Sequence, residues 1–197
     1  MLAIDTVARA CSAAITHDDK VYSAISGTNE KNTDVILAMI LEQMLQSEIE
    51  ASNLKSIIVT NGPGAFTGVR TGLVIAQMLA LVSKSQIQVA SSSMALVAAT
   101  NLKDGTYSVI LDARMNEYYY SKYLVENSVI TALAADVVVQ HVPESAYESD
   151  FLISDMELER FTQVQTNAAC LFKTQKSLPK VAVQDLKPVY LRAAVSS

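Results

Sequence analysis

A glycine-rich loop at residues 62–72 holds the residues whose spacing is most suggestive of chemistry. It reads GPGAFTGVRTG and follows the strand-like run at 56–61. A turn of this kind exposes backbone N–H groups at the start of a helix, where an anion can bind. The loop lacks the ending of a P-loop and the dinucleotide spacing, since Thr67 stands where a third glycine is needed. Phosphate contact, or a tight turn with close helix packing at Gly68 and Gly72, both remain open.

Two aspartates stand at the ends of strand-like runs, one in each half of the chain. Asp5 with Thr6 ends the first run, and Asp112 has the same place in the second half. In a duplicated fold they would face each other across a cleft and could hold a metal-bound phosphate, although either acid can equally shape a turn. Arg114 with Glu117 could be a turn ion pair worth under about 1 kcal/mol. The residues expected to contact phosphate or nucleotide are Asp5, Thr6, Gly62, Gly64, Thr67, Gly68, Arg70 and Asp112.

Other catalytic and metal sites find no support in the sequence. It has no G-x-S-x-G or H-E-x-x-H motif, and its two histidines are isolated. We therefore predict no catalytic residue and no bound metal. Cys11 and Cys170 are expected to be reduced core thiols. The formal net charge is -5 over 197 residues, which excludes a basic surface for autonomous nucleic-acid binding.

The pattern of elements is α/β, in two halves that meet near residue 104. Half of the residues are apolar, so the chain is long and hydrophobic enough to form a core. The N-terminus has no basic leader, and the longest apolar stretch, 73–82, is too short to span a membrane. We expect a soluble, cytoplasmic protein. Strands are predicted at 1–6, 11–16, 21–25, 56–61, 87–91, 107–113, 118–125 and 151–154, and helices at 33–47, 69–83, 93–102 and 167–175.

The two long helices are more apolar than a surface helix requires. The helix at 33–47, with Thr33 as N-cap and Asp34 in its first turn, carries apolar residues on more than one stripe. The helix at 69–83 has few polar positions. Either other parts of the chain bury both faces of these helices, or their outer faces form a subunit interface.

Four motifs in order resemble those of the TsaB (YeaZ) family. They are LAIDT at 2–6, the loop at 62–72, DAR-x-x-E-x-Y at 112–119, and P-x-YLR at 188–192. The resemblance spans nearly the whole chain, with a second half shorter than usual. It implies an actin-like ATPase fold (ASKHA, ribonuclease H-like) of two related lobes. These would be 1–103 and a reduced second lobe at 104–185, with 186–197 returning to the first lobe.

The resemblance also implies a function. TsaB proteins are non-catalytic partners of the catalytic paralogue TsaD in synthesis of N6-threonylcarbamoyladenosine (t6A) on tRNA, beside the anticodon. The implied partners are a TsaD-like subunit, a TsaE-like ATPase reached through the complex, and a second copy of the chain when TsaD is absent; tRNA would be contacted only indirectly. No cofactor is expected to bind the chain alone, and ATP or ADP would bind at the interface with the partner.

The family resemblance places the partner interface on the two long helices. A charge at Met44 or Met78 is predicted to weaken pairing. Family members often carry His-Thr at the start of the first long helix, where this chain has Asn32-Thr33. Asparagine is a poorer transition-metal ligand than histidine. The expected interface residues are Val35, Ile36, Met39, Ile40, Met44, Val74, Met78 and Leu81.

Two enzymatic alternatives compete with the scaffold. An ATP-dependent transferase or kinase of the same fold would use Asp5, Asp112 and the 62–72 loop. Adenosine binding on this fold usually involves glycine pairs late in the second lobe, and residues 106–197 contain no glycine. A peptidase is the remote alternative, since neither a metal site nor a nucleophile is evident.

Overall fold

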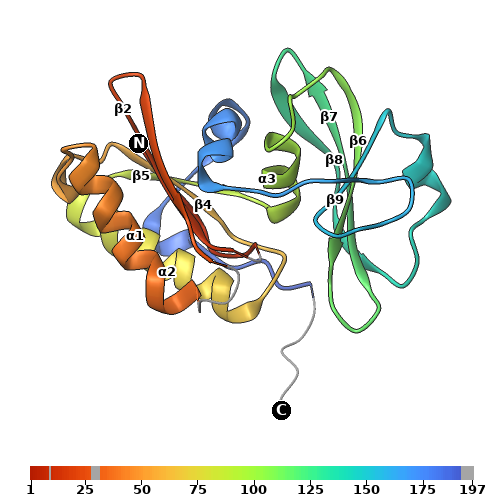
Figure 1. The fold of residues 1–197 in the computed structure, drawn as a ribbon, viewed down its shortest axis with the longest axis horizontal. Helices are drawn as coiled ribbons and strands as arrows, with labels where there is room; N and C mark the ends of the chain where they lie inside the picture. Colours follow the sequence, from red (N-terminus) through yellow and green to blue (C-terminus); the bar gives the residue numbers. More distant parts are fainter. Residues whose placement is uncertain (9, 28–31, 192–197) are drawn as a thin grey trace.

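A computed structural model describes residues 1–8, 10–27 and 32–191, which form two lobes that each contain one β-sheet (Figure 1). The first sheet has six strands in the order β11-β5-β4-β1-β2-β3. The second has five strands in the order β10-β9-β6-β7-β8. The predicted α/β class is therefore confirmed.

The first sheet begins with an antiparallel meander of β1 (Leu2–Asp5), β2 (Ser12–His17) and β3 (Lys20–Ile25). The strands β4 (Ser56–Thr60) and β5 (Gln86–Ala90) then continue the sheet parallel to β1. The apolar runs of β1 and β4 are buried along almost their whole length. Such continuous hydrophobicity is typical of strands covered on both faces.

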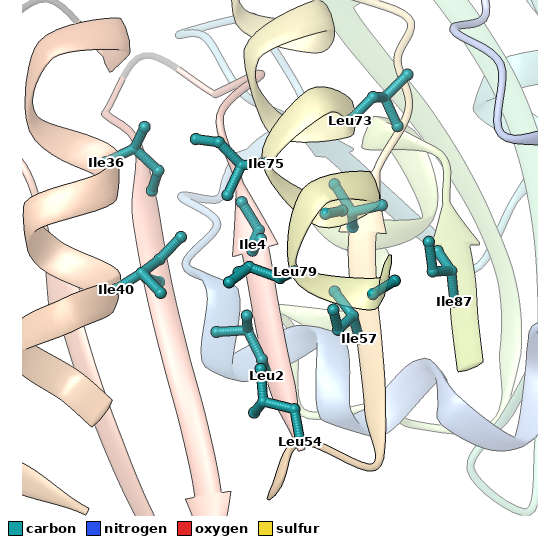
Figure 2. Packing of buried hydrophobic residues seen from close by; sticks show 14 of the residues in the cluster. Leu2, Ile4, Ile36, Ile40, Leu54, Ile57, Leu73, Ile75, Leu79 and Ile87 are labelled. Atoms are coloured by element: carbon teal, nitrogen blue, oxygen red, sulfur yellow. The ribbon is translucent and has the colours of Figure 1, made fainter. Parts of the chain in front are cut away.

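Two long helices cover one face of this sheet (Figure 1). They are α1 (Asn32–Gln46) and α2 (Phe66–Ser83), and α2 starts three residues earlier than the sequence predicted. Figure 2 shows residues of both helices converging on the sheet, with Ile36 and Ile40 from α1 and Ile75 from α2. The side chains at 32 and 33, including the predicted N-cap Thr33, lie outside the described residues.

The second sheet repeats the strand order of the first. Its meander of β6, β7 and β8 is antiparallel, and β9 and β10 follow in parallel to β6. The short helix α3 (Ser92–Ala98) packs against its inner face, beside buried side chains such as Tyr123 and Val125. The strands are β6 (Gly105–Asp112), β7 (Tyr118–Glu126), β8 (Val129–Val139), β9 (Phe151–Ser154) and β10 (Thr162–Gln163).

The chain returns to the first sheet after β10. The segment predicted as a helix at 167–175 is a 3₁₀ helix, η3 (Ala168–Ser177), whose Ala168 and Leu171 pack against the other face of the first sheet. The strand β11 (Lys180–Val181) then pairs with β5. The return therefore begins before residue 186, which is where the family resemblance placed it. Leu186 belongs to the first core, and residues 192–197 lie outside the described part. The remaining short helices are η1 (Ala51–Asn53), η2 (Glu144–Glu148) and η4 (Val183–Asp185).

The helix α2 is the one helix among the described residues that is long and apolar enough to cross a membrane, by length and composition only. One side of α2 packs into the core, through Val69, Leu73, Ala76 and Ala80. A partly buried core helix passes the same test of length and composition, so this property by itself does not indicate a membrane span.

Candidate functional site

A cavity of about 460 Å³ opens between the two lobes. Its walls include the ends of equivalent strands, because Asp5 ends β1 and Asp112 ends β6. Gly64 of the signature loop and the segment 163–166 also line it. The duplicated topology thus brings the two strand-end aspartates to one cavity, which is the arrangement expected from their positions in the sequence.

Asp5 accepts three hydrogen bonds inside the protein. Its Oδ1 accepts from the Thr60 hydroxyl at 2.9 Å and from the Val7 N–H at 3.1 Å. Its Oδ2 accepts from the Thr166 hydroxyl at 2.9 Å. The residue is only 2% exposed. Asp5 therefore ties β1 to β4 and to the segment that returns from the second lobe, which is a structural role.

Asp112 has a more open environment than Asp5. Its Oδ2 pairs with Arg114 Nη1 at 3.3 Å, and its Oδ1 accepts from the Arg114 N–H at 2.7 Å. Its own N–H donates to Asp155 Oδ1 at 3.1 Å. The turn after β6 is tight, with positive φ at Arg114, Met115 and Asn116. Arg114, 74% exposed, is the cation at this side of the cavity.

The glycines of the signature loop serve close packing. A Cβ at Gly68 would collide with the Thr6 carbonyl oxygen, and one at Gly72 would collide with the Thr6 hydroxyl. That hydroxyl donates to the Gly68 carbonyl at 2.7 Å. Gly62 has φ +104°, and a Cβ there would approach the Val189 carbonyl oxygen. The geometry at Gly68 and Gly72 thus favours the tight-turn alternative over phosphate contact.

Five of the eight predicted phosphate contacts do not line the cavity. Asp5, Gly64 and Asp112 do line it. The five that do not are Thr6, Gly62, Thr67, Gly68 and Arg70. Thr6 and Gly68 are buried where α2 crosses the end of β1, and Arg70 points outward from α2.

Sequence reasoning also missed part of the cavity wall. Gln163 ends the two-residue strand β10, and Gln165 and Thr166 lie in the irregular segment that follows; the sequence there gives no periodic signal. Asp155 could have been found, because it directly follows the β9 strand, as Asp5 ends β1. No group of three or more potential metal-ligating residues occurs within the described part of the chain.

The predicted partner interface is partly wrong. Ile36, Ile40 and Met44 face the core and are at most 6% exposed, because this side of α1 lies on the sheet. Val35 and Met39 are half-buried against the same core. The α2 residues are exposed as predicted, and three α1 residues missed by the sequence join them. We call these six residues the apolar α1–α2 face: Leu37, Leu41, Leu45, Val74, Met78 and Leu81.

Both cysteines are buried, and neither forms a disulfide. Burial raises the pKa of the Cys170 thiol to about 11. The thiol also donates to the Asn167 carbonyl oxygen at 2.9 Å. A thiol in this state is a poor nucleophile, because the thiolate is the reactive form.

Comparison with solved structures identifies the fold. A crystal structure of an uncharacterised Pseudomonas aeruginosa protein, with similarity to peptidase YeaZ, superposes with a TM-score of 0.83. It is 23% identical, and the match covers 97% of this chain and 98% of that one. YeaZ from the same organism gives a TM-score of 0.80 at 23% identity, over 96% of this chain and 98% of that one. The fold is the two-lobed, actin-like (ribonuclease H-like) fold.

Sequence comparison defines the family. A family model described as TsaD, tRNA N6-adenosine threonylcarbamoyltransferase, matches residues 24–185. The tRNA threonylcarbamoyladenosine biosynthesis protein TsaB of Escherichia coli is 29% identical over 100% of this chain and 96% of its own length. TsaB of Bacillus subtilis is 31% identical, over 69% of this chain and 60% of its own. The chain belongs to the TsaD family, in its TsaB (YeaZ) group.

Proposed function

We propose that this chain is a non-catalytic scaffold subunit in the synthesis of t6A on tRNA, and that it binds a TsaD-like catalytic protein. The similarity to Escherichia coli TsaB along the whole chain supports the pathway. The apolar α1–α2 face is the observation that carries the scaffold role. Leu45 is 79% exposed and Leu81 69% exposed, beside further apolar side chains on both helices. Apolar patches of this kind mark protein interfaces.

The state of Asp5 supports the non-catalytic assignment over the ATP-dependent transferase or kinase. In that alternative Asp5 would hold a metal-bound phosphate. Its two oxygens instead accept three internal hydrogen bonds. Releasing the Thr60 hydroxyl would leave a buried donor without a partner, which costs about 1–3 kcal/mol.

The remaining parts of the proposal concern the assembly. ATP or ADP would bind at the interface with the partner, and a TsaE-like ATPase would join through the complex. The same α1–α2 face would pair two copies of this chain when the partner is absent. Because the net charge is -5, contact with tRNA would be indirect. The assembly would operate in the cytoplasm.

Measuring complex mass tests the scaffold role. The chain is mixed with the TsaD-like protein from the same source and studied by analytical ultracentrifugation. We expect a stable complex that Leu81→Asp disrupts. Leu133→Asp is the matched control, since Leu133 is 50% exposed on β8 of the other lobe. Absence of a complex with the unmodified chain would contradict the proposal.

Calorimetry with ATP tests the enzymatic alternative. The isolated chain is titrated with ATP in the presence of Mg²⁺, and released phosphate is assayed. We expect neither micromolar binding nor turnover. If both were observed, the hypothesis of an ATP-dependent transferase or kinase would replace that of a scaffold subunit.

A further inference from the structure

An arginine interrupts the exposed row of apolar residues on α2. Phe66, Arg70, Val74 and Met78 follow one another at intervals of four residues, so they share one side of the helix. All four are exposed to solvent. The opposite side of the helix is buried in the core of the first lobe. The apolar α1–α2 face therefore continues past Val74 to a cation and an aromatic ring.

Phe66, the first residue of this row, packs against Tyr190 from the C-terminal part of the chain. The Phe66 ring stacks on the Tyr190 ring, with 4.9 Å between centroids and 24° between planes. Tyr190 is positioned from the main chain, because the Val189 N–H donates to the Asn61 carbonyl at 2.8 Å. Phe66 and Tyr190 remain 43% and 41% exposed. Two motifs of the sequence thus meet in a built aromatic corner at the surface.

Arg70 is placed over the Phe66 ring of this corner. Its Cζ lies 5.0 Å from the centroid of the Phe66 ring. Within the described part of the chain, no carboxylate lies within ion-pair distance of Arg70. A guanidinium stacked on a ring keeps its N–H edges available for a carboxylate or a phosphate. The apolar neighbours and the overall charge of -5 favour a protein carboxylate over a polyanion.

We propose that Arg70, with Phe66 and Tyr190, forms an anchor point for a carboxylate side chain of the partner protein, at the end of the apolar α1–α2 face. This inference rests on the proposed function, because it names the partner chemistry at the same surface. Arginine and aromatic residues are enriched among the few interface residues that dominate binding energy. The anchor would also fix the register of the partner along α2, which apolar contacts alone do not.

Affinity measurements with the TsaD-like protein test the anchor. Arg70→Met keeps the stem and removes the charge, and we expect it to weaken binding by about tenfold or more. Arg70→Lys keeps the charge but lacks the planar guanidinium, so its affinity should lie between those of the unmodified chain and Arg70→Met. Binding by the unmodified chain should weaken with added salt more steeply than binding by Arg70→Met. Arg160→Met is the matched control, because Arg160 stacks on Tyr147 of the second lobe at 4.4 Å and should leave affinity unchanged.

The outcomes separate this inference from the proposed function. If Leu81→Asp disrupts the complex and Arg70→Met does not, the anchor is wrong and the scaffold stands. If the unmodified chain forms no complex, the scaffold itself fails. Arg70-dependent binding of inorganic phosphate by the isolated chain would overturn the carboxylate assignment. An effect of Arg70→Met on self-association alone would assign the anchor to a second copy instead, and would overturn the inference.

Discussion

The two sheets share one strand order but differ in what connects their strands. In the first lobe, the connections after β3 and after β4 contain α1 and α2. In the second lobe, the equivalent connections are residues 140–150 and 155–161, and they hold only the short helix η2. The two sheets thus share the duplicated topology, while the long helices, which among the described residues only the first lobe has, supply the apolar α1–α2 face. The lobe that has the helices is the one that we assign to partner binding.

The largest difference in the free energy of unfolding should lie between variants on the buried side and on the exposed side of α1. Met44 is 6% exposed in the core, whereas its neighbour Leu45 is 79% exposed. Met44→Asp buries an unpaired carboxylate and should lower the free energy of unfolding by about 3 kcal/mol or more. Leu45→Asp should change it by about 0.5 kcal/mol or less while weakening partner binding. Urea titrations of both variants check this, and equal destabilisation would place α1 differently on the sheet.

The glycines of the two lobes should also respond unequally. Gly68→Ala forces a Cβ against the Thr6 carbonyl, which is backbone and cannot move away cheaply. We expect a loss of about 2–4 kcal/mol. Gly105→Ala meets the flexible Asp150 side chain instead, at φ +141°, and should cost about 1–2 kcal/mol. Thermal unfolding measures both, and a larger loss at Gly105 would contradict the packing described for α2.

The two strand-end aspartates offer a third test. Asp5→Ala leaves the buried hydroxyl of Thr60 and the half-buried hydroxyl of Thr166 without their acceptor and should cost about 2–3 kcal/mol. Asp112→Ala removes a partly exposed pair with Arg114 and should cost about 1 kcal/mol or less. Denaturant unfolding at neutral pH gives both values. Equal losses would argue against the structural role assigned to Asp5.

The smallest effect concerns pH. Asp136 lies half-buried on β8, where its Oδ1 accepts from the Ser93 hydroxyl of α3, and this partial burial raises its pKa. A raised pKa means that the ionised form destabilises the fold at neutral pH, and that this penalty is relieved as pH falls through the folded-state pKa. Compared with Asp136→Asn, the unmodified chain should therefore gain stability as the pH falls over that window.

Asp150, in the same lobe, has a pKa shifted in the opposite direction to that of Asp136. The N–H and hydroxyl of Thr106 donate to it and lower its pKa. Its contribution is present above its unfolded-state pKa and is lost as pH falls through the lower, folded-state pKa. As the pH is lowered, the urea midpoint of the unmodified chain should rise relative to that of Asp136→Asn. It should fall relative to that of Asp150→Asn. Shifts in the same direction would contradict the burial of Asp136.

Much of the fold could be predicted from the sequence. The strands of both meanders form continuous or alternating apolar runs, and the strand at 151–154 was predicted at its observed bounds. The facing of α1 could not be predicted, because Ile36 and Leu37 are equally apolar and only the position of the sheet separates them. Part of the cavity wall could not be predicted either. Residues 163–166 reach the cavity only because the chain turns back there toward the first sheet.

That return has a consequence for how the protein is made. Thr166 bonds to Asp5 across most of the sequence, and β11 completes the edge of the first sheet beside β5. During synthesis from the N-terminus, the first lobe must therefore leave the ribosome without its last strand and without η3 against one face. A nascent chain cut near residue 104 would expose the β5 edge and a small-residue surface. The N-terminal lobe should thus depend on late-emerging residues, and its folding should be completed only near the end of translation.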